Sequence, residues 1–361
     1  MTFVFEFANI WLVGANSLRD QRTPFMVGKR RPSSDVFCFC PKPKAGRVNS
    51  NSRSLVSAIL PAISLYQKYA KIQQKQKSKK GTCTFLEITM RFEKLLLGVK
   101  KNILLKNYTT FRIGGRAKYF FVAKTKENLI KAITVAKKLR LPFFILGGGS
   151  NLLVSDKGYK GLVIKFGRPL SLYVSKGLDW AAGIPGTIEG AVYGNAGAFG
   201  KSMKDVVKSV EVFDTKTEKI EIFKDCQFGY RDSIFKKKKN LIILSVKIKS
   251  GKSDWKKIKE HLDYRKQRHP KLPSAGSVFK NPAPSSGAGR GVEETPVAIL
   301  IHQAGLTGKK VGDAQISEKH SNFIVNLGNA KAKDVLKLIK LTKKSVKKKF
   351  GIVLEEEIQF L

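Results

Sequence analysis

The chain has 361 residues, enough for two or three domains of ordinary size. Hydrophobic residues make up 42% and charged residues 27%, which excludes a wholly disordered chain and fits a globular protein with a packed core. The 69 Lys and Arg residues against 27 Asp and Glu give a formal charge of +42, which indicates either an anionic partner or lysine-rich codon usage spread over a solvated surface. The lysine-rich runs at 236–240 and 343–351 lack the interleaved aromatic residues that stack on bases. We therefore expect no nucleic-acid partner, and a basic nucleic-acid-binding protein is kept as an alternative.

The four cysteines show no spacing typical of a metal site, so we expect no bound metal, no disulfide framework and a reducing compartment. No apolar run reaches the roughly 18 residues that a membrane-spanning helix needs. The longest candidate, residues 55–66, is too short and contains Pro61. We therefore expect a cytoplasmic protein without a membrane span.

Residues 1–89 form a basic segment in which apolar fragments alternate with stretches rich in Ser, Pro and Gln. No helical or strand period is sustained there, which predicts little ordered structure. From Met90 onward the pattern becomes that of a folded αβ protein. Met90 is thus a candidate start, and residues 1–89 are expected to be a dispensable extension or a misread upstream region, with a targeting sequence as the alternative.

Two amphipathic helices are predicted in the rest of the chain. The first covers residues 125–139, with Thr125 as its N-cap and apolar side chains at helical spacing on one face. The second covers roughly residues 333–350, with Gly351 as its C-cap. Both are expected to be structural.

A buried strand, FFIL at residues 143–146, runs into a glycine-rich turn. The turn consists of small and polar residues: Gly147, Gly148, Gly149, Ser150 and Asn151. Main-chain N–H groups without side chains suit phosphate oxygens, although a plain strand–turn–strand hairpin is the alternative. This is not a dinucleotide-binding Rossmann fingerprint, because G-x-G-x-x-G is absent and residues 152–156 predict a strand instead of a helix.

A second glycine-rich segment, AGIPGTIEGAVYGNAGAFG, follows at residues 182–200. Six glycines among small residues let a backbone lie against a flat or extended ligand, since a Cβ would hold it away. The two segments together predict a dinucleotide held by main chain. A third run, LPSAGSVFKNP at 272–282, combines turn-forming residues and is either a surface loop or a loop with a functional hydroxyl at Ser277.

Seven motifs in this order resemble the UDP-N-acetylenolpyruvoylglucosamine reductase family, FAD enzymes of bacterial cell-wall synthesis. The resemblance covers about residues 90–361 and leaves residues 1–89 outside. Its motifs are NYTTFRIGG (107–115), LGGGSNLLVSD (146–156), GIPGTIEGAVYGNAGAFG (183–200), FGYRDSIFK (228–236), PSAGSVFKNP (273–282), HQAGLTGKKVGDAQISEKHSNFIVN (302–326) and LEEEI (354–358).

The resemblance implies an α+β fold with a two-lobed FAD-binding domain of the vanillyl-alcohol-oxidase type and a C-terminal αβ substrate-binding domain. The lobes would cover residues 90–167 and 168–251, and the substrate domain residues 252–361. The implied reaction reduces the enolpyruvyl ether of a UDP-sugar to a lactyl ether, with non-covalent FAD and with NADPH as hydride donor. A monomer is expected.

The family's three catalytic groups match Ser277, Arg231 and Glu357. A serine hydroxyl can protonate a strongly basic carbanion, an arginine can brace a developing enolate, and a glutamate can orient or assist protonation. The alternatives for these residues are a turn serine, a surface ion-pair partner and an exposed strand residue.

The resemblance also implies binding residues. The implied cofactor contacts are Gly147, Gly148, Gly149, Ser150, Asn151, Gly183, Ile184, Pro185, Gly186, Thr187, Gly190, Asn195, Ala196 and Gly197. The implied substrate contacts are Tyr230, Lys280, Asn281 and His320, of which the histidine could instead be satisfied by a neighbouring backbone group.

The chain departs from the family in two places. Only ten residues, 167–176, stand where family members carry a strand–helix unit, and Glu189 replaces the second glycine of a more usual GTIGG. We therefore expect an open cofactor site, and the alternatives are an inactive or flavin-poor relic of the enzyme or another flavin oxidase. Only residues 237–240 follow the FGYRDSIFK motif before the next strand, which indicates the subtype without a lid.

Overall fold

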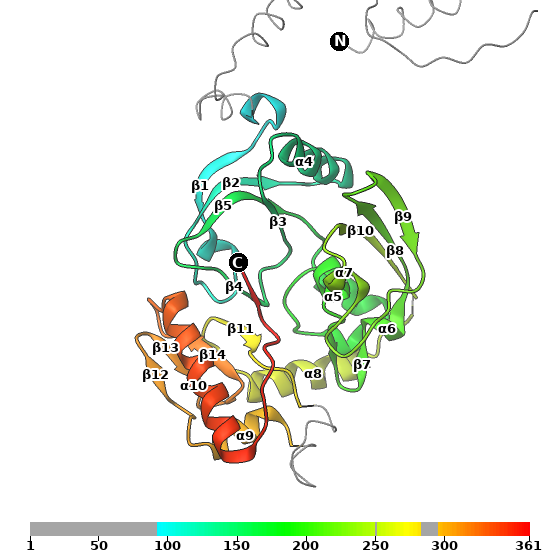
Figure 1. Cartoon of the computed structure of the whole chain (residues 1–361). Coiled ribbons are helices and arrows are strands. Elements are labelled where there is room, and N and C mark those ends of the chain that lie inside the picture. Colours follow the sequence, from blue (N-terminus) through cyan, green and yellow to red (C-terminus); the bar gives the residue numbers. More distant parts are fainter. Residues whose placement is uncertain (1–91, 250, 283–294) are drawn as a thin grey trace, which may run out of the picture. The chain divides into compact units, whose positions relative to one another are not determined.

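The computed structural model describes residues 92–249, 251–282 and 295–361 (Figure 1). Every described residue belongs to one compact unit of the chain. The predictions made for residues 1–89 therefore lie outside the described residues.

The first lobe is a four-stranded mixed sheet. In sheet order its strands are β1 (Lys100–Leu104), β2 (Arg116–Val122), β5 (Tyr159–Lys165) and β3 (Phe143–Leu146). The pair β1–β2 is antiparallel, and a 3₁₀ helix, η2 (Leu105–Tyr108), lies in its connection. The strands β2, β5 and β3 run parallel, so β3 and β5 deliver their carboxyl ends to the same edge of the sheet.

The predicted first helix is confirmed as α4 (Lys126–Lys138), which packs on this sheet (Figure 1). Its N-cap is Thr125, whose hydroxyl accepts a hydrogen bond from the N–H of Asn128. The buried face of α4 includes Leu129 and Ile133, which join the apolar cluster formed by the strands. The helix therefore forms because its apolar residues repeat at helical spacing and its first turn is capped.

The second lobe is a three-stranded antiparallel sheet with the order β10-β8-β9. Its strands are β8 (Val207–Asp214), β9 (Lys219–Phe223) and β10 (Leu241–Ile248). The short helices and the small hairpin of this lobe are α5 (Ile188–Tyr193), β6 (Gly197–Ala198), β7 (Lys201–Ser202), α6 (Met203–Val206) and α7 (Ile234–Lys237). Only residues 238–240 separate α7 from β10, as expected for a chain without a lid.

The connection between the lobes contains no strand or α-helix in the described chain from β5 to α5. It consists of two 3₁₀ helices, η3 (Leu170–Lys176) and η4 (Asp179–Ala181). Among the described strands, β10 pairs only with β8 and is an edge strand. Within the described strands, the second sheet therefore ends at β10.

The C-terminal part begins with α8 (Trp255–Arg268) and contains a four-stranded sheet covered by helices (Figure 1). In sheet order its strands are β11 (Ser274–Ser277), β14 (Phe323–Asn326), β13 (Ala314–Ile316) and β12 (Lys310–Val311). The helices are α9 (Val297–Gln303) and α10 (Ala332–Phe350), the second ending at Gly351 in the left-handed conformation, as predicted. The apolar core of this part also takes in Phe111, Ile113 and Leu153 from the first lobe.

The C-terminal tail ties this part back to the first lobe. Strand β15 (Gln359–Phe360) pairs in parallel with β4 (Leu152–Leu153), the short strand that follows the first glycine-rich turn. The N–H groups of Gln359, Leu361 and Ser155 complete three main-chain hydrogen bonds across this contact. The tail is therefore a structural link between the two parts.

Removing residues 359–361 should lower the free energy of unfolding by about 1–3 kcal/mol, because three main-chain hydrogen bonds are lost. Chemical denaturation monitored by circular dichroism measures this change. The variant with alanine at all three positions keeps the backbone and should lose less. Equal losses in both variants would mean that the side chains, and not the main-chain pairing, hold the tail.

Candidate active site

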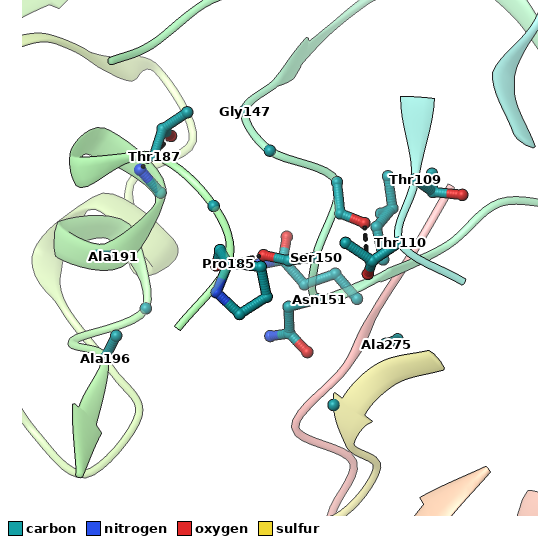
Figure 2. Close-up of a pocket in the computed structure, with 18 of the residues that line it drawn as sticks. Thr109, Thr110, Gly147, Ser150, Asn151, Pro185, Thr187, Ala191, Ala196 and Ala275 are labelled. Atoms are coloured by element: carbon teal, nitrogen blue, oxygen red, sulfur yellow. Dashed lines mark hydrogen bonds between the residues drawn. The ribbon is translucent and has the colours of Figure 1, made fainter. Parts of the chain in front are cut away.

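A cavity of about 1410 Å³ lies between the two lobes and the C-terminal part. It is lined by residues of β3, β10 and β11, by both glycine-rich segments and by the tail. Figure 2 shows Gly147, Ser150 and Asn151 on one segment and Pro185 and Thr187 on the other. The predicted site residues that line the cavity are Gly147, Gly148, Gly149, Ser150, Asn151, Gly183, Ile184, Pro185, Gly186, Thr187, Gly190, Ala196, Gly197, Arg231, Ser277 and Glu357.

The two glycine-rich segments touch each other through their main chains. A Cβ added at Gly148 would lie 2.4 Å from the Cα of Gly186, which is closer than real Cβ atoms approach. The Ser150 hydroxyl donates a 3.0 Å hydrogen bond to the carbonyl oxygen of Pro185 (Figure 2). Gly148 is therefore required by packing between segments, a constraint that the sequence pattern alone attributed to a ligand.

The turn after Gly148 is held in place by contacts with Tyr108 and Thr110, which follow β1 in the first lobe. Gly149 has a φ of 65°, and a Cβ there would lie 2.2 Å from the carbonyl oxygen of Tyr108. The N–H of Thr110 donates a hydrogen bond to the Gly149 carbonyl oxygen (3.1 Å). The Thr110 hydroxyl donates another to the carbonyl oxygen of Ser274 (2.8 Å). Thr110 thus joins the glycine turn to β11, a role that sequence reasoning did not assign.

The cavity offers the donors that an anionic dinucleotide requires. Within the described residues, the N–H groups of Gly148, Gly149 and Ser150 donate no hydrogen bond. In the same part of the chain, the Arg265 side chain from α8 has a buried Nη2 without a partner, while its Nε donates to the carbonyl oxygen of Ala182 (2.8 Å). Unused amide groups and an uncompensated guanidinium lining one cavity fit a diphosphate.

Arg231 and Glu357 form an ion pair in this cavity. The Arg231 Nε donates to Glu357 Oε1 at 2.7 Å, and Nη2 donates to the carbonyl oxygen of Gly197 at 3.1 Å. Arg231 is the third residue of a tight turn that is closed by hydrogen bonds between Gly229 and Asp232. Its φ is 53°, in the left-handed region. The turn therefore aims the guanidinium at Glu357 at the cost of an unfavourable backbone conformation.

The tail places Glu357 beside the loop that carries Ser277. The Glu357 N–H donates to the Val278 carbonyl oxygen (2.8 Å), and the Lys280 N–H donates to that of Glu355 (2.9 Å). Ser277 ends β11 and lines the cavity, and its hydroxyl makes no hydrogen bond to another described residue. The three predicted catalytic residues are therefore brought together, and the serine hydroxyl is available to a ligand.

Burial raises the pKa of the Glu357 carboxyl, and the positive charges of Arg231, Lys236 and Lys280 oppose this rise. Lys236 Nζ donates to the carbonyl oxygen of Arg231 at 2.9 Å, so it supports the tight turn. Burial, followed by repulsion from Lys280, lowers the pKa of Lys236. The sequence did not single out Lys236, although it is the last residue of the FGYRDSIFK motif.

The predicted substrate residues Tyr230, Lys280 and Asn281 lie next to one another beyond the cavity lining. The Tyr230 hydroxyl accepts a hydrogen bond from the N–H of Asn281 (3.4 Å), and the Asn281 side chain accepts one from the N–H of Val297 (3.2 Å). Lys280 pairs with Glu355. The Tyr230 side chain is exposed, and its ring lies against the Arg231 guanidinium.

Two further predicted residues also lie outside the cavity lining. The side chain of Asn195 donates to the Gly229 carbonyl oxygen (2.7 Å) and so supports the turn that carries Arg231. The His320 ring accepts a hydrogen bond at Nδ1 from the N–H of Asn322 (3.3 Å), and burial lowers its pKa. The neighbouring His269 lines the cavity instead, and burial lowers its pKa to about 4.

Comparisons with known proteins identify the family. The model of the UDP-N-acetylenolpyruvoylglucosamine reductase C-terminal domain matches residues 267–361. The reductase of Caldicellulosiruptor bescii is 42% identical over 288 residues, which cover 71% of this chain and 88% of that protein. The reductase of Clostridium novyi is 36% identical over 308 residues, which cover 76% and 97%. The chain belongs to the UDP-N-acetylenolpyruvoylglucosamine reductase family.

A solved structure supports the same assignment. The crystal structure of the UDP-N-acetylenolpyruvylglucosamine reductase from Thermus caldophilus has 34% sequence identity and a TM-score of 0.59, and the match covers 73% of this chain and 98% of that one. The predicted family, the mixed αβ fold class and the oxidoreductase class are therefore confirmed. No described helix is long and apolar enough to cross a membrane, and the described residues contain no group of three or more metal-ligating side chains.

Gly148→Ala should separate the two glycine-rich segments, because its Cβ cannot fit against Gly186. We expect a loss of about 1–3 kcal/mol in the free energy of unfolding, measured by denaturant titration. Gly194→Ala is the matched control, since the nearest atom to its Cβ is 3.8 Å away, and it should change stability by less than about 1 kcal/mol. Equal stability of the two variants would contradict the packing role of Gly148.

Proposed function

We propose that the chain reduces the enolpyruvyl ether of UDP-N-acetylglucosamine to a lactyl ether, with FAD as bound cofactor and NADPH as hydride source. The net change adds a hydride to C3 and a proton to C2 of the enolpyruvyl group, while NADPH becomes NADP⁺. One observation carries the proposal: the cavity bounded by both glycine-rich segments also contains Arg231, Ser277 and Glu357. We also propose a cytoplasmic monomer that binds no nucleic acid.

FAD, when bound, supplies the hydride carrier between NADPH and the substrate. The residues proposed to hold it are those of the two glycine-rich segments. The proposed donors to its diphosphate are the Arg265 guanidinium and the amide groups of Gly148, Gly149 and Ser150, which donate to no other described residue. Asn195 would act on this site through the turn at Gly229.

The proposed proton donor is Ser277. Hydride addition at C3 leaves negative charge on C2 and the adjacent carboxylate, so C2 becomes basic enough to take the proton of a hydroxyl. The positive charge of Arg231 would stabilise the developing enolate. Glu357 holds Arg231 in place through their ion pair and would orient or assist the protonation.

The proposed substrate contacts are Tyr230, Lys280, Asn281 and His320. Lys280 carries the positive charge suited to a diphosphate or carboxylate, and its side chain is only 17% exposed. His320 would contribute through its Nε2, because Nδ1 already accepts a hydrogen bond from Asn322. The competing hypothesis is a flavin-poor relic, and it is motivated by the missing unit at residues 167–176.

Ser277→Ala should leave reduction of the flavin by NADPH nearly unchanged and slow its reoxidation by the enolpyruvyl substrate by about 10²–10⁴-fold. The reason is that the hydroxyl acts only after hydride has left the flavin. Stopped-flow absorbance under anaerobic conditions separates the two half-reactions. Equal slowing of both would mean that Ser277 has a structural role only.

The missing unit should weaken cofactor retention, because edge strand β10 borders the cavity with Leu241, Ile242 and Ile243. Gel filtration should strip flavin from this protein more readily than from the Clostridium novyi reductase. Inserting the segment of that relative between Phe166 and Gly177 should tighten binding. Stoichiometric flavin after gel filtration of the unaltered chain would make the gap harmless and this expectation wrong.

A further inference from the structure

The shortened connection pairs with the second glycine-rich segment. Pro169 and Thr187 form an antiparallel bridge. On one side of the bridge, the Leu170 N–H donates to the Gly186 carbonyl oxygen at 3.0 Å. On the other side, the N–H of residue 188 donates to the carbonyl oxygen of residue 168 at 2.9 Å. The connection is therefore fastened to the segment that the cofactor requires.

An ion pair closes this contact. Glu189 Oε2 accepts a hydrogen bond from the Arg168 main-chain N–H (2.8 Å), and Oε1 accepts one from the Arg168 Nε (3.1 Å). The Glu189 side chain is 8% exposed and the Arg168 side chain 47%. The Arg168 guanidinium also lies 5.7 Å from the centre of the Tyr173 ring in η3. Both oxygens of a buried carboxylate are thus used by one residue of the short connection.

The pair stands where the connection and both glycine-rich segments meet. A Cβ added at Gly167 would lie 2.8 Å from Glu189 Oε2 and 2.9 Å from Thr187 Oγ1. A Cβ added at Gly147 would lie 2.8 Å from the same Thr187 oxygen. Glu189 also lines the cavity, two residues after Thr187. A carboxylate here faces the space proposed for an anionic cofactor, so its charge has to be compensated.

We propose that Arg168 and Glu189 are positioning residues that together replace the missing strand–helix unit at the cofactor site. Glu189 fastens the short connection to the second glycine-rich segment, and Arg168 neutralises Glu189 so that a diphosphate is tolerated beside it. This inference rests on the proposed use of FAD. The inference predicts that removing the positive charge of Arg168 weakens FAD binding more than removing the negative charge of Glu189, because the diphosphate of FAD is itself negative.

Arg168→Met should raise the dissociation constant for FAD by roughly tenfold. This effect lies between the small effect of breaking an exposed ion pair and the large effect of breaking a buried one, because the pair is partly buried. Glu189→Gln removes the negative charge and keeps one of the two oxygens that accept hydrogen bonds from Arg168, so it should weaken FAD binding less than Arg168→Met does. The Arg168→Met/Glu189→Gln double variant should bind better than Arg168→Met alone. The measurement is titration of flavin-free protein with FAD, followed by flavin fluorescence.

Ionic strength separates charge compensation from simple loss of structure. Salt screens the repulsion between an uncompensated Glu189 and the diphosphate, so the ratio of the dissociation constants of Arg168→Met and the unaltered chain should fall as salt rises. A structural defect alone would leave that ratio constant. Lys126→Met is the matched control, because Lys126 forms another partly buried ion pair, with Glu211, away from the cavity.

Three outcomes would overturn the inference: equal weakening by Arg168→Met and Glu189→Gln, no rescue in the double variant, or unchanged binding in Arg168→Met. If Arg168→Met does not fold, the test compares the FAD dissociation constants of Glu189→Gln and of the double variant with that of the unaltered chain. Failure of the unaltered chain to bind FAD would instead reject the proposed function, and this inference with it.

Discussion

The main-chain contact between the two glycine-rich segments is the constraint on which the site depends. Because Gly148 and Gly186 approach closer than any side chain permits, the end of β3 and the start of α5 are held against each other. That contact defines one wall of the cavity, where amide N–H groups of the first segment have no hydrogen-bond partner among the described residues. The glycines therefore serve packing first, and the ligand-binding surface follows from it.

The chemical groups are brought to this wall by segments distant in the sequence. Arg231 comes from a tight turn in the second lobe, Ser277 from the end of β11, and Glu357 from the tail. The tail is anchored to β4, directly after the first glycine-rich turn, so this turn and the Glu357 carboxylate share one support. Burial raises the pKa of the Glu357 carboxyl, and the positive charges of Arg231, Lys236 and Lys280 oppose this rise.

Local patterns in the sequence predicted the helices α4 and α10 and the glycine-rich segments, because each follows from short-range periodicity or composition. The resemblance to the family pointed to Arg231, Ser277 and Glu357, and the structure brings them into one cavity. Contacts made by single side chains over long sequence separations could not be predicted. The Asn195 amide supports a turn 34 residues away, and Arg168 compensates Glu189 across the shortened connection.

Anaerobic single turnover of the flavin tests the central claim most directly, that one cavity holds a flavin beside the groups that protonate an enolpyruvyl ether. The full chain is loaded with FAD, reduced with NADPH and mixed with the enolpyruvyl UDP-sugar while the visible flavin absorbance is recorded. We predict that the oxidised flavin band returns in proportion to the substrate added, with formation of the lactyl ether. A reduced flavin that stays reduced in the presence of excess substrate would contradict the account.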